Sequence, residues 1–258
     1  MNHPADANWH RDPAGSGGIP VPERSEARVF PLAALWVALA GLIGGLFIAV
    51  LLTLPIVLLW EDADAVAGAA AMLGLYVGFA AAGWVASIQW GTGRPLADLG
   101  VRFRRADLGW GPVAALGALT VTVALALAFS LVPDLEGTNT EFVERQASTV
   151  AGVVMVLLAT TIGAPIFEEI FFRGLVLRAL RSRMSAPPAV TLQALLFGLV
   201  HVQAGQGLGT ISVVAATAAI GAVLGVAATV SGRLGPGMIG HALFNGVVVT
   251  SVLLGPGT

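Results

Sequence analysis

Three short polar motifs interrupt apolar stretches in the C-terminal half of the chain, and they carry side chains that acid/base chemistry requires. The motifs are APIFEEIFFRG with Glu168, Glu169 and Arg173, FGLVH with Phe197 and His201, and HALFN with His241 and Asn245. A charge at the centre of a membrane helix costs roughly 2.5 to 3.5 kcal/mol on insertion scales, so each group requires a reason. Because the motifs lie on separate apolar segments, we expect them to line one shared cavity.

The two adjacent carboxylates cannot share the same surroundings. Neighbouring helix residues diverge by about 100°, whereas residues four apart lie on one face. Glu169 and Arg173 are four apart and can neutralise each other, which lowers the cost of burying both charges. Glu168 is left without that partner, and an unpaired carboxylate near an imidazole can take a proton from water.

The two histidines and the amide complete the candidate site. His241 and Asn245 are four residues apart, so both can reach one space, where their donors could hold an oxyanion. Phe197 and His201 repeat this spacing, and the ring could shield the imidazole. Glu168 with His201 would then form an acid/base pair. The implied reaction is peptide hydrolysis by an activated water.

Each of these residues also has a purely structural interpretation. Glu169 and Arg173 form a supporting ion cluster on either interpretation, and Glu168 could belong to it. A lone histidine in a helix bundle is usually a packing element, Phe197 is ordinary core material, and Asn245 could simply bridge two helices. The joint occurrence of carboxylates, imidazoles and an amide on three segments favours the catalytic interpretation.

The composition points to the bilayer as the solvent. Hydrophobic residues make up 56% of the 258 residues and charged residues only 11%, with a mean hydropathy of +0.85. Cysteine is absent, which excludes a thiolate nucleophile, disulfides and cysteine-ligated metals. The net charge is −2, so no nucleic-acid partner is indicated. The high Ala, Gly, Val and Arg content without Lys indicates a GC-rich bacterial genome, and hence the inner membrane.

Hydrophobic segments of about 20 residues predict an all-α fold, a polytopic transmembrane helical bundle of about seven spans. The segments are 30–60, 65–90, 109–132, 149–177, 187–204, 209–231 and 235–255. Six or eight spans remain possible, because 187–204 is short and 30–60 is long enough to hide a re-entrant turn. Residues 1–28 are predicted to be a flexible cytoplasmic tail, and residues 29–258 the transmembrane domain.

The arginines are distributed unevenly between alternate loops, which predicts the orientation of the chain. Twelve of the thirteen fall in the tail and in the second, fourth and sixth loops: Arg11, Arg24, Arg28, Arg94, Arg102, Arg104, Arg105, Arg173, Arg178, Arg181, Arg183 and Arg233. The opposite loops hold only Arg145, and two of them are acidic. We therefore expect a multi-pass protein with a cytoplasmic N-terminus.

The three motifs EExxxR, FxxxH and HxxxN, in this order on successive hydrophobic segments, resemble the signature of the CAAX-protease and bacteriocin-processing (Abi) family. This family includes the Ras-converting prenyl endopeptidase. The resemblance covers roughly residues 149–250. It implies that Glu168 and His201 activate water, that His241 and Asn245 form the oxyanion hole, and that Glu169 with Arg173 is mainly structural. It implies a peptide or membrane-protein substrate and no cofactor.

Other functions compatible with the same residues remain open. Glu168, His201 and His241 could instead bind zinc, since two imidazoles and a carboxylate leave an open metal position. The protein could also be a non-catalytic scaffold, an immunity factor or a proton-coupled carrier. One feature disagrees with a shared cavity: counted from the segment ends, Glu168 and His241 lie roughly 13 and 10 Å deep, but His201 lies near 21 Å.

Overall fold

The computed structural model describes residues 30–60, 63–138, 140–146, 149–202 and 206–255, and all regular structure in these ranges is helical. The seven predicted apolar segments form α1 (Ala34–Leu59), α2 (Asp64–Trp90), α4 (Asp107–Phe129), a composite helix (Val150–Arg181), α9 (Ala186–Leu199), α10 (Gly209–Ser231) and α11 (Gly235–Leu253). Two short helices, α3 (Pro95–Asp98) and α5 (Glu141–Gln146), lie in the connections. The predicted tail, residues 1–28, lies outside the described residues.

Six of these helices are long and apolar enough to cross a membrane, which confirms the predicted polytopic bundle. The exception is α9, whose 14 residues form a helix about 21 Å long. It is too short to cross a hydrocarbon core about 30 Å thick. The predicted segment 187–204 is therefore shorter as a helix than its apolar sequence, because the helix ends at Leu199 and His201 lies in the turn beyond. His201 thus lies just beyond a helix end and not in a helix interior.

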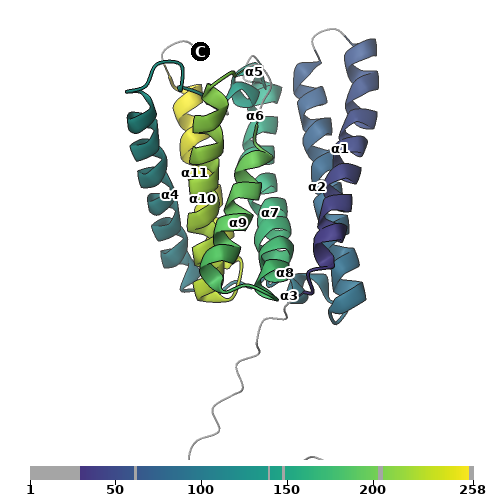
Figure 1. The fold of residues 1–258 in the computed structure, drawn as a ribbon. Coiled ribbons are helices and arrows are strands. Elements are labelled where there is room, and N and C mark those ends of the chain that lie inside the picture. Colours follow the sequence, from purple (N-terminus) through teal and green to yellow (C-terminus); the bar gives the residue numbers. More distant parts are fainter. Residues whose placement is uncertain (1–29, 61–62, 139, 147–148, 203–205, 256–258) are drawn as a thin grey trace, which may run out of the picture.

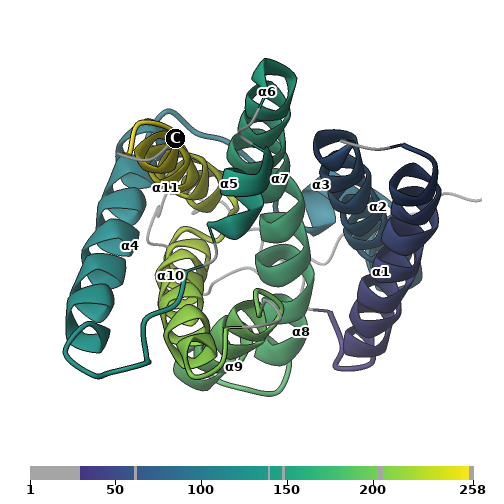
Figure 2. The ribbon, with the colours of Figure 1, turned by 90° about the horizontal axis from the view of Figure 1, so that it is seen from above.

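The composite helix lies at the centre of the bundle. It consists of α6 (Val150–Leu158), the π-helix η1 (Ala159–Gly163), α7 (Ala164–Glu168), the π-helix η2 (Glu169–Val176) and α8 (Leu177–Arg181). Seen from above, it lies between the α1–α2 hairpin and the group formed by α4, α10 and α11 (Figure 2). Residues Phe171, Phe172 and Leu175 of η2 belong to the main hydrophobic core. This position buries every residue of the polar EExxxR motif except Glu168 almost completely.

Small residues let the helices approach closely where hydrophobicity alone cannot hold them together in lipid. A Cβ at Gly41 would lie 2.5 Å from Cβ of Ala82, and one at Gly45 would lie 3.3 Å from Cα of Gly78. On α10, Gly221 packs in the same way against Ala194 of α9. Gly41 and Gly45, which are four residues apart on α1, thus both lie at the contact with α2.

The arginine-bearing loops after α2, α8 and α10 meet at one end of the bundle. Arg178 donates from Nη1 to the carbonyl oxygen of Asp98 at 2.8 Å, and Arg233 forms an ion pair with the buried Asp107. Leu234 N–H donates to the Gly100 carbonyl at 2.9 Å. Figure 1 shows α3 and α8 together at this end. The described structure therefore agrees with the predicted alternation of the loops, except that Arg173, which was counted in the fourth loop, lies buried in η2.

The carboxylate of Asp98 organises the loop after α2. It accepts hydrogen bonds from Ser87 Oγ at 2.6 Å, from Thr92 N and Oγ1 at 2.8 Å each, and from Arg94 N at 3.3 Å. Burial acts to raise the pKa of Asp98, but these hydrogen bonds outweigh it and hold the pKa below its usual value. The ionised form is therefore the form that the fold selects.

We predict a pH-dependent stability from Asp98. Because its pKa is lowered on folding, its stabilisation is present above the unfolded pKa of about 3.9 and is lost as the pH falls through the folded value. The melting temperature of the detergent-solubilised protein should fall below about pH 4. In Asp98→Asn, where the amide opposes two backbone donors, the melting temperature should be lower at pH 7 and should approach the wild-type value at pH 3. A constant difference at all pH values would contradict this role.

Candidate active site

The central helix brings the acidic motif into the interior at the junction of α7 and η2. Glu168 is the last residue of α7 and Glu169 the first of η2. The π-helix inserts additional residues per turn, a geometry that often accompanies functional sites. Both carboxylates face α11, which supplies the HALFN motif.

Glu169 and Arg173 form the predicted ion pair. Arg173 Nη1 lies 2.8 Å from Glu169 Oε1, and both side chains are fully buried. Arg173 also donates from Nη2 to the Gly221 carbonyl at 3.1 Å, and its guanidinium lies 4.5 Å above the centre of the Phe197 ring. Three kinds of contact thus compensate the buried cation, as a charge in a low-dielectric interior requires.

Glu168 has quite different surroundings. Its side chain keeps 15% of its surface accessible, and its Oε2 lies 3.8 Å from Nε2 of His241. This buried oxygen accepts no hydrogen bond from any described residue. Glu168 is therefore a carboxylate with a free acceptor atom beside an imidazole, and that imidazole is His241, whereas the sequence predicted His201.

His241 lies between the two carboxylates. Its Nδ1 is 3.3 Å from Glu169 Oε1, while its Nε2 faces Glu168. The ring is almost completely buried. The four-residue spacing associates His241 with Asn245, because such a spacing shows only that two side chains share a helix face. The packing of the helices decides which groups lie opposite this face of α11.

His201 lies at the end of α9 and contacts Phe197. Its Nδ1 is 2.6 Å from the Phe197 carbonyl oxygen, and the two ring centres are 4.5 Å apart. A carbonyl only accepts, so Nδ1 of His201 carries a hydrogen and is the donor in this bond. Among the described residues, His201 forms no hydrogen bond or ion pair with Glu168. The structure therefore does not bring the predicted pair into direct contact.

The Phe197 ring joins the two histidines. Its centre lies 6.1 Å from the His241 ring, 5.0 Å from the Phe172 ring and directly below Arg173. Both imidazoles therefore lie against one aromatic ring, although the depth estimate from sequence separated them.

Asn245 bridges α11 to the central helix. Its Nδ2 donates to the Thr160 carbonyl at 2.7 Å. An amide nitrogen has two hydrogens, so one remains available for another acceptor. The three motifs do not include Tyr76 of α2, whose hydroxyl donates to the neighbouring carbonyl, that of Ala159, at 2.8 Å. The signal for it was present, since Tyr76 is the one tyrosine of the chain and lies in an apolar segment.

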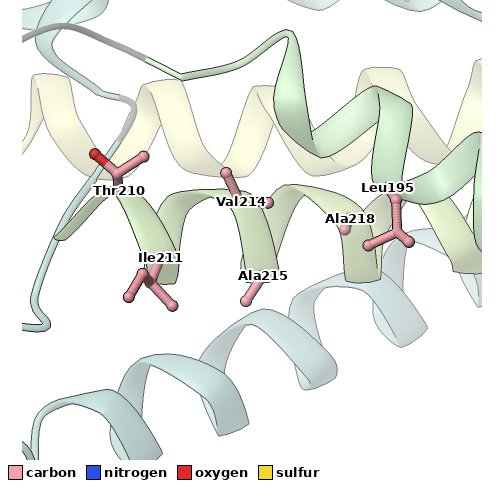
Figure 3. Close-up of a pocket in the computed structure, with 6 residues that line it drawn as sticks. All are labelled: Leu195, Thr210, Ile211, Val214, Ala215 and Ala218. Atoms are coloured by element: carbon pink, nitrogen blue, oxygen red, sulfur yellow. The ribbon is translucent and has the colours of Figure 1, made fainter. Parts of the chain in front are cut away.

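A separate apolar cavity of about 360 Å³ lies between α9 and α10 (Figure 3). Its lining consists of Leu195, Thr210, Ile211, Val214, Ala215 and Ala218. None of these residues ionises, so this cavity does not house the chemistry. In the described part of the chain, no three histidine, aspartate or glutamate side chains are grouped so that they could hold a metal ion.

Comparison with known proteins supports the family resemblance. Residues 150–247 match the family model described as Type II CAAX prenyl endopeptidase Rce1-like. The matched range begins with the composite helix and ends just after Asn245, so it contains all three polar motifs. No curated protein and no solved structure matches the chain.

Proposed function

Since residues 150–247 carry the sequence of a protease family, we propose that this chain is an intramembrane endopeptidase that hydrolyses peptide bonds with an activated water and no metal. The observation that carries the proposal is the buried Oε2 of Glu168, which lies 3.8 Å from His241 and accepts no hydrogen bond from a described residue. A buried polar atom of this kind is stabilised by a water. A carboxylate that binds water is placed to deprotonate it.

The proposed reaction uses each motif for one task. Glu168 takes a proton from water, and we assign Nε2 of a neutral His201, which lies against the same Phe197 ring as His241, as a second proton acceptor. The water oxygen attacks the carbonyl carbon, and the negative charge that develops on the carbonyl oxygen is stabilised by the second N–H of Asn245 and by Nε2–H of His241. This role requires His241 to carry both protons, because its Nδ1–H is bound to Glu169. As the C–N bond breaks, the proton held by Glu168 passes to the departing amine.

The Glu169–Arg173 pair supports this chemistry without taking part in it. Glu169 Oε1 accepts from both Arg173 and His241, which fixes the imidazole in front of Glu168. Phe197 fixes the second imidazole and excludes water from the guanidinium. Both imidazoles are therefore held in a fixed orientation before the substrate binds.

The proposed substrate is a peptide or membrane protein that enters from the bilayer. The proposed location is a bacterial inner membrane, with the N-terminus and the arginine-rich loops in the cytoplasm, because positively charged loops are retained there during insertion. Substrates are identified by comparing peptides released from membranes of cells that express the wild-type protein or Glu168→Gln.

We predict that cleavage by the purified protein is insensitive to metal chelators. Proteoliposomes treated with 1,10-phenanthroline and then washed should retain full activity toward a peptide identified in that comparison. Elemental analysis should find less than stoichiometric zinc. Loss of activity that added zinc restores would favour a metal site at Glu168, His201 and His241. Solute flux without cleavage would favour a carrier.

A further inference from the structure

One turn before Glu168, the central helix is wound as a π-helix. The Ala164 N–H donates to the Ala159 carbonyl, five residues back, as π geometry requires. The next donor in this register would be residue 165, which would reach the Thr160 carbonyl. Residue 165 is proline and has no N–H, so Thr160 has no backbone donor in the π register.

Side chains from two other helices bind the carbonyls of this turn. Asn245 of α11 donates to Thr160 at 2.7 Å, and Tyr76 of α2 donates to Ala159 at 2.8 Å. In the apolar interior of a membrane protein an unsatisfied carbonyl costs several kcal/mol, so Asn245 replaces the backbone donor that Thr160 lacks. Tyr76 adds a second donor to Ala159, which already accepts the Ala164 N–H. The π turn is therefore held from both sides, by α2 and by α11.

Tyr76 fits this turn closely. Its ring stacks on Phe167, with 4.8 Å between ring centres and 12° between planes, and only 8% of the residue is exposed. A Cβ added to Gly163 would lie 2.7 Å from Cε2 of the tyrosine ring. Tyr76 thus contacts Ala159, Gly163 and Phe167, and Phe167 directly precedes Glu168.

We propose that Tyr76 is a positioning residue for the proposed hydrolysis, because its hydroxyl on Ala159, together with Asn245 on Thr160, holds the π turn that sets the rotation of Glu168 toward His241. A π turn contains one residue more than the α-helical winding it replaces. If the turn relaxed to α-helical bonding, the following residues would rotate by about 100°. Glu168 would then turn away from His241. The inference rests on the proposed function of Glu168.

Tyr76→Phe tests the inference, because it removes one oxygen and keeps the stacked ring. In proteoliposomes with a synthetic peptide from the substrate comparison, we expect kcat to fall by about 10- to 100-fold with KM within about twofold. Thr120→Val is the matched control, since it removes a hydroxyl that bonds only within α4 on an exposed face. Its kcat should equal that of the wild type.

A second measurement does not depend on activity. Because Tyr76 is the one tyrosine, 3-fluorotyrosine labels a single site, and the full-length protein should give one main ¹⁹F resonance. We expect Asn245→Ala to shift or broaden this resonance, since both side chains hold the same turn, while Thr120→Val leaves it unchanged. An unchanged resonance in Asn245→Ala would overturn the coupling, even if Tyr76→Phe failed to fold.

The outcomes separate the two proposals. Wild-type kcat in Tyr76→Phe, with Glu168→Gln inactive, would overturn the positioning role and leave the proposed function standing. Full activity in both variants would overturn the proposed function as well.

Discussion

Glu168→Gln should reduce peptide cleavage by about 10³-fold or more while the protein stays folded in the membrane. The amide has nearly the same shape as the carboxylate but cannot accept a proton from water, so the general base is removed without a cavity. Because Oε2 of Glu168 is buried without a donor among the residues that the structure describes, neutralising it should leave the melting temperature unchanged or raise it. Cleavage is measured by mass spectrometry of released peptides, and folding by thermal unfolding in detergent.

Glu169→Gln is the matched control, since it makes the same chemical change at the adjacent residue. Here the buried Arg173 loses its counter-charge, and we expect a lower melting temperature together with reduced activity. The two variants should differ in melting temperature, because only Glu169→Gln breaks the fully buried ion pair with Arg173. Persistent cleavage in Glu168→Gln would remove the catalytic assignment of that residue.

Arg173→Met should produce the largest loss of stability among single substitutions at the site. The methionine fills part of the space but leaves the fully buried Glu169 without its cation, and such a broken pair typically costs 3 to 5 kcal/mol. The Gly221 carbonyl and the Phe197 ring lose a partner at the same time. The measurement is the melting temperature in detergent, together with the yield of membrane-inserted protein.

The double variant Glu169→Gln/Arg173→Met distinguishes charge from shape. If the uncompensated carboxylate causes the instability, removing its charge should restore much of the melting temperature lost in Arg173→Met. If the double variant is as unstable as the sum of the two single variants, the guanidinium acts through packing on Phe197 and not through the ion pair.

The local pairings at the site could be predicted because they depend on helix geometry alone. Glu169 and Arg173 are four residues apart, and four residues return a side chain to the same face in any helix, including this distorted one. The contrast between the paired Glu169 and the unpaired Glu168 follows from the same spacing. The predicted partnership of Glu168 with His201 was beyond such reasoning, because it joins two helices whose relative rotation no spacing defines.

The sequence by itself determined the solvent, the apolar segments and the alternation of arginine-rich loops, because bilayer thickness and charge retention act on each segment independently. The tertiary structure decided which side chains face one another: His241 between both carboxylates, the Phe197 ring against both imidazoles, and Tyr76 on the π turn. These contacts depend on the end of α9 at Leu199 and on the π winding before Glu168. The π turn receives side-chain donors from α2 and α11, so its winding is fixed only when these helices pack.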